Sequence, residues 1–147
     1  MSGFSLRPAL EADAPTIQAL IELVDINPAG LDWRRFVLAV DGADRLIGCG
    51  QLKPHGKEVL ELASIAVHPE HRGKGIARAV IEHLLAASPR PLFLMCQSSM
   101  GKLYEKFGFQ TIDYEHMPRY FQRLTRVEGL VQLMESEGES LLIMKLE

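Results

Sequence analysis

The segment 60–87 constrains the fold more than any other part of this 147-residue chain. It begins with an apolar run that is typical of a buried strand and that ends at His68-Pro69. Gly73 and Gly75 follow, and apolar residues then recur at four-residue spacing, as they do on one face of a helix. Glycines allow positive φ and close approach, and a helix N-terminus offers free N–H groups and a favourable dipole. The pattern therefore predicts an anion site, suited to a phosphate, between a strand and a helix.

Two other nucleotide-binding patterns fit this loop less well. A Walker loop needs a Lys-Ser or Lys-Thr pair after its second glycine, and that pair is missing here. A dinucleotide fingerprint needs Gly-x-Gly-x-x-Gly, but Arg78 occupies the position of its third glycine. The other alternative is an ordinary loop that enters a helix.

Composition and charge exclude several classes of function. The chain is 47% hydrophobic and 24% charged, which is ordinary for a globular domain of this length. Its net charge of −3 gives no footprint for nucleic acid or for an acidic membrane. No apolar run approaches the length of a membrane span, and the start Met1-Ser2-Gly3-Phe4 lacks a secretory pattern. We therefore expect one cytoplasmic domain with neither a nucleic-acid nor a membrane partner.

The cysteines and histidines do not predict a metal site. Cys49 and Cys96 each lie in an apolar run, as buried, reduced cysteines do in a cytosolic protein. His68 and His71 are close in sequence, but Pro69 between them disrupts the regular helix that two ligands at this spacing would need. We interpret both as loop histidines beside the phosphate site. The remaining histidines are expected on the surface: His55, His83 and His116.

The order of elements up to residue 67 indicates an antiparallel meander, in which short turns join strands. The expected strands are 4–7, 36–40, 46–52 and 59–67, with turns at 41–44 and 53–57, a helix over residues 14–24 that Asp13 can cap, and a helical turn at 31–35. A helix over 75–87 then leads to a strand over 92–96. This strand–helix–strand unit makes its two strands parallel, with a right-handed crossover.

The segment 116–137 is the least expected part of the chain. Pro118 suits a first helical turn, and apolar residues from Phe121 to Met134 line one side of a helix that we place at 117–134. Gly129 could break this helix. A closing strand is expected over 141–146.

Four segments resemble the GNAT N-acetyltransferase superfamily between residues 4 and 109. They are the loop Arg72-Gly73-Lys74-Gly75-Ile76-Ala77, of the form Arg-x-x-Gly-x-Ala, the strand end Ile65-Ala66-Val67-His68-Pro69, the strand Phe93-Leu94-Met95-Cys96, and Tyr104-Glu105-Lys106-Phe107-Gly108-Phe109. The resemblance implies an α/β fold with a mixed, mostly antiparallel sheet, helices on both faces, and the crossover at the coenzyme A site. It implies a single N-acetyltransferase domain over 1–147, in which the helical insertion at about 116–137 departs from the family.

The resemblance also implies how the coenzyme would be held. The pantetheine arm of acetyl-coenzyme A would pair with the backbone of the fourth strand, and the N–H of Val67 would face the thioester oxygen as an oxyanion donor. Gln97 takes the place of an asparagine that contacts the coenzyme, and Met100 replaces a small residue. The expected coenzyme-binding residues are Ile65, Ala66, Val67, Arg72, Gly73, Lys74, Gly75, Ile76, Ala77 and Gln97.

Tyr104 and Glu61 are the candidate catalytic residues. The resemblance makes Tyr104 the general acid for the thiolate, because a phenol keeps its proton at neutral pH; packing at a helix end is the alternative. Glu61 is the candidate base, because burial in an apolar strand would raise its proton affinity, and it lies four residues before Ile65, where some histone-acetylating relatives carry a glutamate. Strand alternation predicts that Glu61, Ala63, Ile65 and Val67 share one face. A water chain as the base, and a solvent-facing role for Glu61, remain alternatives.

The acceptor is expected to be a primary amine, with a small molecule or amino acid preferred to a protein terminus. Family acceptors would enter beside residues 27–33 and 116–126, and direct transfer in a ternary complex is expected. Candidate contacts are Asp25, Asp32 and Glu115 for a cationic amine, and Arg119, Arg123 and Arg126 for a carboxylate. The alternatives are a non-catalytic acyl-coenzyme A sensor, a peptide N-acetyltransferase, and an interaction domain or homodimer that uses the 117–134 helix.

Overall fold

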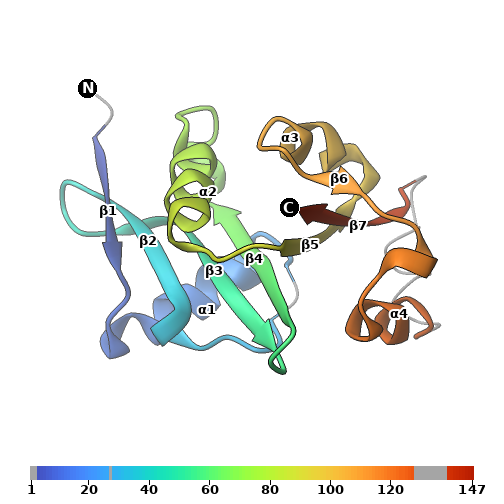
Figure 1. Ribbon diagram of the computed structural model, residues 1–147. Helices are drawn as coiled ribbons and strands as arrows, with labels where there is room; N and C mark the ends of the chain where they lie inside the picture. The colour runs from blue at the N-terminus through green and yellow to red at the C-terminus, as the bar shows by residue number, and fades with distance from the viewer. Residues whose placement is uncertain (1–2, 27, 128–138) are drawn as a thin grey trace. The chain divides into compact units, whose positions relative to one another are not determined.

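The computed structural model describes residues 3–26, 28–127 and 139–147 (Figure 1). The strands are β1 (Phe4–Pro8), β2 (Phe36–Asp41), β3 (Leu46–His55), β4 (Val59–Val67), β5 (Leu92–Gln97), β6 (Gln110–Thr111) and β7 (Leu141–Leu146), and the α-helices are α1 (Ala14–Leu23), α2 (Ile76–Ala87), α3 (Gly101–Glu105) and α4 (Arg119–Thr125). The sheet has the order β1-β2-β3-β4-β5-β7-β6. The β4–β5 pair is parallel, with Glu61 opposite Phe93, whereas β1–β2, β2–β3, β5–β7 and β6–β7 are antiparallel. This confirms the expected mixed, mostly antiparallel sheet with a crossover through α2.

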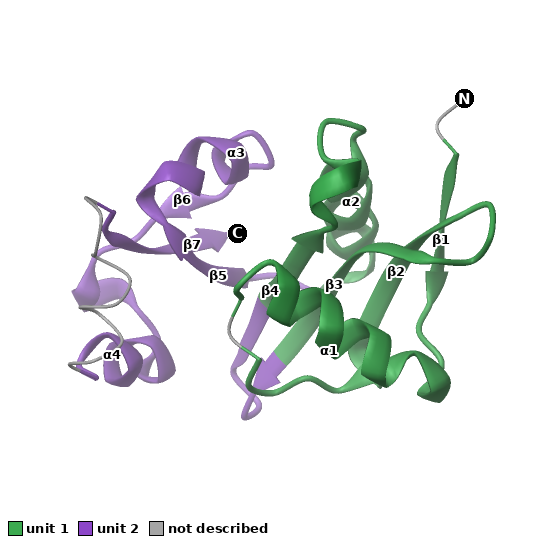
Figure 2. Ribbon diagram, turned by 180° about the vertical axis from the view of Figure 1, so that it is seen from behind, with its two compact units in different colours: residues 1–53, 62–88 green, residues 54–61, 89–147 purple. Residues whose placement is uncertain are grey.

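The chain divides into two compact units (Figure 2). Unit 1 comprises residues 1–53 and 62–88, and unit 2 comprises residues 54–61 and 89–147. The long strands β3 and β4 each contribute to both units. The expectation of a single domain over 1–147 stays a prediction.

Unit 1 carries α1 and α2 on opposite faces of its strands (Figures 1 and 2). On the α1 face, the buried helix residues Ile17, Leu20 and Ile21 pack against apolar side chains of β2 and β3. On the α2 face, strand β3 has glycine at position 50 instead of an apolar side chain. A Cβ at Gly50 would lie 2.8 Å from a side-chain atom of Val80 in α2. Glycine in β3 therefore lets α2 lie close to the sheet.

Unit 2 is built around β7, which lies between β5 and β6. Its buried cluster joins strand residues Val59, Phe93 and Ile143 to Phe121 of α4. Phe121 is completely buried, with its ring centroid 5.8 Å from that of Phe93. Helix α4 is thus anchored in unit 2 by the apolar side that the sequence predicts.

Several sequence predictions need correction. Strand β3 runs to His55, past the end predicted at residue 52, and β6 was not predicted at all. Asp13 does not cap α1 through its side chain; its carboxylate instead accepts hydrogen bonds from Arg7, at 2.8 and 3.1 Å, and from the N–H of Leu10. Helix α4 ends at Thr125, short of the predicted end at residue 134, and positions 128–138 lie outside the described residues. Among the helices of the described ranges, none has the length and apolar character needed to cross a bilayer.

Candidate active site

The glycine loop forms a cavity at the N-terminus of α2 in unit 1. The cavity has a volume of about 150 Å³ and is lined by Val67, His71, Arg72, Gly73, Gly75, Ile76, Ala77 and Arg78. Gly75 is the N-cap residue, and both Gly73 and Gly75 have φ of +79°, a conformation that favours glycine. Because the Ala79 N–H donates to the Gly75 carbonyl at 3.1 Å, the N–H groups of residues 76–78 precede the first helical hydrogen bond. The loop therefore has the unfilled donors that an anion needs.

The cationic side chains at this loop differ in their pairing, and Arg78 forms an ion pair with Glu82 at 2.7 Å. No carboxylate in the described parts of the chain forms an ion pair with Arg72 or Lys74. The Lys74 ammonium lies 3.2 Å from Nδ1 of His71, which places the two side chains together over the loop. His68 accepts a hydrogen bond from the N–H of Glu70, so it begins the short turn that precedes the loop. The expected loop histidines are therefore found beside the glycines.

Strand β4 runs through an irregular residue at Ser64, a feature that the sequence analysis missed. Ser64 has φ of +58°, which is rare in a strand for a residue other than glycine. The Gln51 side-chain amide donates to Ser64 Oγ at 2.9 Å, and Gln51 itself is fully buried. A left-handed residue breaks the two-residue period, so the predicted common face of Glu61 and Val67 does not follow across it. The same irregularity can turn backbone groups of β4 away from the ladder.

Tyr104 lies in α3 and is buried in unit 2. Its side chain packs edge-to-face on Phe109, with ring centroids 6.1 Å apart. Burial raises the pKa of Tyr104 to about 12, and the neighbouring Cys96 thiol adds to the rise when ionised. The phenol therefore keeps its proton throughout the physiological range, as a hydrogen-bond donor must.

Glu61 is buried in unit 2 and is paired with a histidine. It is 7% exposed, and its Oε1 lies 2.6 Å from Nε2 of His55 at the end of β3. The His55 ring stacks on Tyr120 of α4, with centroids 3.7 Å apart and planes within 15°. The expected surface position of His55 is therefore wrong: its side chain is 11% exposed. The sequence places His55 and Glu61 on either side of a hairpin turn, but only the pairing of the two strands brings their side chains together.

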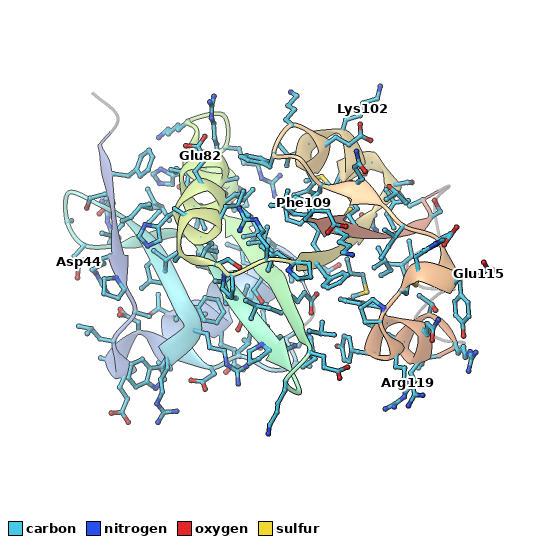
Figure 3. All side chains as sticks on the ribbon, viewed as in Figure 1. Asp44, Glu82, Lys102, Phe109, Glu115 and Arg119 are labelled. Carbon is cyan, nitrogen blue, oxygen red and sulfur yellow. The ribbon has the colours of Figure 1, made fainter. Side chains whose placement is uncertain are left out.

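A second cavity opens beside this pair in unit 2. It has a volume of about 590 Å³ and is lined by His55, Gly56, Lys57, Glu58, Val59, Pro118, Arg119, Tyr120 and Arg123. Three cations, Lys57, Arg119 and Arg123, thus face one carboxylate, that of Glu58. Within the described residues, none of the three cations forms an ion pair. Figure 3 shows Arg119 extending outward from α4. The cavity is suited to an anionic group such as a carboxylate.

The other predicted contacts do not join these cavities. Arg126 lies 5.1 Å from the ring centroid of Tyr114, and Asp32 accepts a hydrogen bond from the N–H of Arg34. Gln97 is exposed at the end of β5, and Met100 is 40% exposed. Asp25 and Glu115 are also exposed. Among the described residues, no group of three or more His, Cys, Asp or Glu side chains could hold a metal ion.

The sequence was compared with those of known protein families and proteins. Residues 32–111, more than half of the chain, match a family model described as an acetyltransferase (GNAT) domain. A mycothiol acetyltransferase from Actinosynnema mirum is 33% identical over 81 residues, which cover 50% of this chain and 27% of that protein. The matched segment therefore spans about a quarter of the length of this relative.

Solved structures show the same fold at low sequence identity. N-acetylglutamate synthase from Neisseria gonorrhoeae, complexed with coenzyme A and N-acetyl-glutamate, has a TM-score of 0.73 at 21% identity, over 98% of this chain and 35% of that one. Arabidopsis thaliana Naa50, in complex with the bisubstrate analogue CoA-Ac-MVNAL, has a TM-score of 0.68 at 15% identity and covers 99% of both chains. One neighbour thus holds an acetylated amino acid, and the other holds a peptide analogue.

Proposed function

The chain belongs to the GNAT acetyltransferase family, and from this premise we propose that it transfers the acetyl group of acetyl-coenzyme A to the primary amine of a small acceptor. The observation that carries the proposal is the glycine loop at the N-terminus of α2. It combines in one cavity two left-handed glycines, three free N–H groups and the guanidinium of Arg72, which forms no ion pair within the described residues. A pyrophosphate needs this combination of close backbone approach and positive charge.

We assign the coenzyme to residues 72–77, with the pantetheine arm along the backbone of Ile65, Ala66 and Val67. The left-handed Ser64 supports this assignment, because a local irregularity within a strand can free backbone groups for an added partner. The N–H of Val67 would stabilise the tetrahedral oxyanion. Tyr104 would donate to the departing thiolate, and Gln97 would contact the coenzyme arm. Transfer would be direct, within a ternary complex.

The acceptor is proposed to be a free amino acid that binds in the cavity between the β3–β4 turn and α4. The three cations of that cavity, Lys57, Arg119 and Arg123, would hold its α-carboxylate. A peptide N-terminus carries no carboxylate beside its amine, so the charge of the cavity favours the amino acid. Binding of N-acetyl-glutamate by the synthase neighbour agrees with this preference. A cytosolic location and a homodimer contact through residues 117–134 stay predictions.

The test of coenzyme binding is calorimetry with acetyl-coenzyme A. Gly75→Glu inserts bulk and negative charge where a phosphate must approach, so affinity should fall well over tenfold. Gly56→Glu is the matched control, because Gly56 also has positive φ, of +67°, and open space around its Cβ position. It carries the same strain and the same charge away from the loop, and should bind the coenzyme like the wild type. Equal affinity in a folded Gly75→Glu variant would remove the basis of the proposal.

The test of the reaction is turnover on a panel of amines. Free amino acids and their C-terminal amides form the matched pairs, because the amide keeps the amine and removes the carboxylate. We expect the free acids to be acetylated with the lower KM. A preference for amides or peptides would indicate a peptide acceptor, and coenzyme binding without turnover would indicate an acyl-coenzyme A sensor.

A further inference from the structure

We infer that His55 is the group that receives the proton of the acceptor amine and that Glu61 is its positioning residue. This inference rests on the proposed function and deepens it, because the sequence had assigned the base to Glu61 itself. The structure places the imidazole between the carboxylate and the cavity that we assign to the acceptor. His55 lines that cavity, whereas Glu61 does not.

The contact between the two side chains fixes the tautomer of His55. A carboxylate only accepts hydrogen bonds, so the ring nitrogen 2.6 Å from Oε1 of Glu61 is the one that carries the hydrogen, Nε2. The other nitrogen, Nδ1, then bears the lone pair. Nδ1 makes no hydrogen bond to any part of the chain that the structure describes. The neutral ring therefore offers a free proton acceptor.

The surroundings of the pair hold the ring in one orientation and stabilise its cationic form. Tyr120 stacks on one face of the imidazole at 3.7 Å, and Phe121 lies edge-on with its centroid 6.5 Å away. An aromatic face attracts the imidazolium that forms when the proton arrives, and the adjacent buried carboxylate neutralises it. Burial and the charge of Glu61 raise the pKa of Tyr120, so the phenol stays neutral beside the pair.

The proton balance of the reaction assigns one proton to His55. The acceptor ammonium gives a proton to Nδ1, which later passes to solvent, and the free nitrogen pair forms the bond to the thioester carbon. As this bond forms, the π electrons of the thioester carbonyl move to its oxygen and give a tetrahedral intermediate. When the carbonyl forms again, the carbon–sulfur bond breaks and its electron pair stays on sulfur. The attacking nitrogen then loses a second proton, and the departing thiolate gains one proton through Tyr104, so the total number of protons is unchanged. The same logic, with a carboxylate orienting an imidazole base, underlies triads in hydrolases.

The decisive experiment is a pH profile of kcat/KM, from pH 5.5 to 9.5, for wild type and variants on an amine that the wild type acetylates. The groups that face His55 are Glu61 from β4, Tyr120 from α4 and, around the cavity, Lys57, Glu58, Arg119 and Arg123. A protonated ring has no lone pair left to receive the proton of the amine, so the wild type should lose rate at the acid end of the profile. His55→Gln should lower kcat/KM about 10²-fold near neutral pH, and the acid limb that remains should follow the ionisation of the acceptor amine alone. Glu61→Gln should lower it less and keep the acid limb of the wild type, because the imidazole remains.

Two controls separate chemistry from folding. His83→Gln changes an exposed histidine of α2 and should leave the profile unchanged. The tautomer is read directly on wild-type protein by nitrogen NMR of the histidine rings at pH 9. There His55 should be the Nε2–H form, and His116, whose Nδ1 contacts Asp113, should be the Nδ1–H form. The NMR reading needs no variant, so it decides even if His55→Gln fails to fold.

The outcomes distinguish this inference from the function on which it rests. If the wild type acetylates no amine, the proposed function fails and the inference fails with it. If the wild type is active and folded His55→Gln keeps the rate and the acid limb of the wild type, the inference alone fails and Glu61 or water is the base. An Nδ1–H tautomer at His55 would also overturn it.

Discussion

At the scale of single residues, Tyr104 shows how burial limits a catalytic role. A phenol whose pKa is raised to about 12 donates a hydrogen bond at every pH that an assay can use. A thiol with a pKa of about 8.5 is a stronger acid than this phenol, so complete proton transfer from Tyr104 to the thiolate is unfavourable. The transfer contributes only if Tyr104 takes a proton from another group in the same step. Tyr104 is therefore better suited to stabilising the leaving group than to ionising.

Tyr104→Phe should keep coenzyme affinity and lower kcat about 10²-fold, because only the hydroxyl is removed. No alkaline limb below pH 10 should arise from Tyr104, since its titration lies near pH 12. Steady-state kinetics measure kcat, and calorimetry measures the Kd of acetyl-coenzyme A. Tyr114→Phe is the control, because that phenol is 37% exposed. A loss below threefold, with chemistry shown to limit the rate, would assign Tyr104 to packing.

At the scale of elements, α4 joins an apolar anchor to a cationic rim. Phe121 fixes the helix in the core of unit 2, and Tyr120 beside it holds His55. Arg119 and Arg123 are four residues apart, so they share a side of the helix, and both line the larger cavity. This single short helix thus supplies both the stacking surface and the charge that the proposed acceptor needs.

Replacing Arg119 and Arg123 together by alanine should raise the KM for a free amino acid at least tenfold, because a charge-assisted pair to a carboxylate is lost. The KM for the matching amide should change little. Arg126→Ala is the comparison, since Arg126 stacks on Tyr114 and does not line the cavity. Steady-state kinetics on each acid and its amide provide the measurement. Equal effects on the acid and the amide would mean that the cations do not bind a carboxylate.

The same elements show what the sequence could and could not predict. The strands, α2 and its glycine loop follow from local patterns, because periodicity and positive-φ glycines are written in adjacent residues. The His55–Glu61 contact and the left-handed Ser64 depend on pairing across a hairpin and on Gln51, which comes 13 residues earlier. A two-residue strand such as β6 is too short to show a period. The end of α4 was misplaced because apolar spacing continued in the sequence beyond Thr125.

At the scale of the whole molecule, buried thiol and phenol groups in both units make the stability of the fold sensitive to alkaline pH. Burial raises the pKa of Cys49 in unit 1 to about 12 and that of Cys96 in unit 2 to about 11. Together with Tyr104, these groups bind their protons more tightly in the folded chain than in the unfolded one. Their contribution to stability is therefore complete below their ordinary pKa values, 9.0 for the thiols and 10.0 for the phenol, and is lost as pH rises toward 12.

The free energy of unfolding should accordingly fall above pH 9, by about 1.4 kcal/mol per pH unit for Cys49 alone. Urea denaturation at pH 8, 9, 10 and 10.5 measures this slope. Cys49→Ala should start from a lower stability, because it opens a small cavity, but its slope should be shallower. Parallel slopes for the two proteins would contradict the assignment of alkaline sensitivity to this thiol.

The burial of both cysteines also has a practical consequence. Acetyl transfer releases coenzyme A with a free thiol, and a chromogenic thiol reagent reports each turnover as colour. Cys49 and Cys96 are the two cysteines of the chain, both are buried, and both are held in the unreactive thiol form. The cysteines of the folded enzyme should therefore not react with the reagent, so the colour should report only the coenzyme A that is released. A cysteine introduced at an exposed position would conversely be a single addressable handle for a fluorophore or a surface attachment.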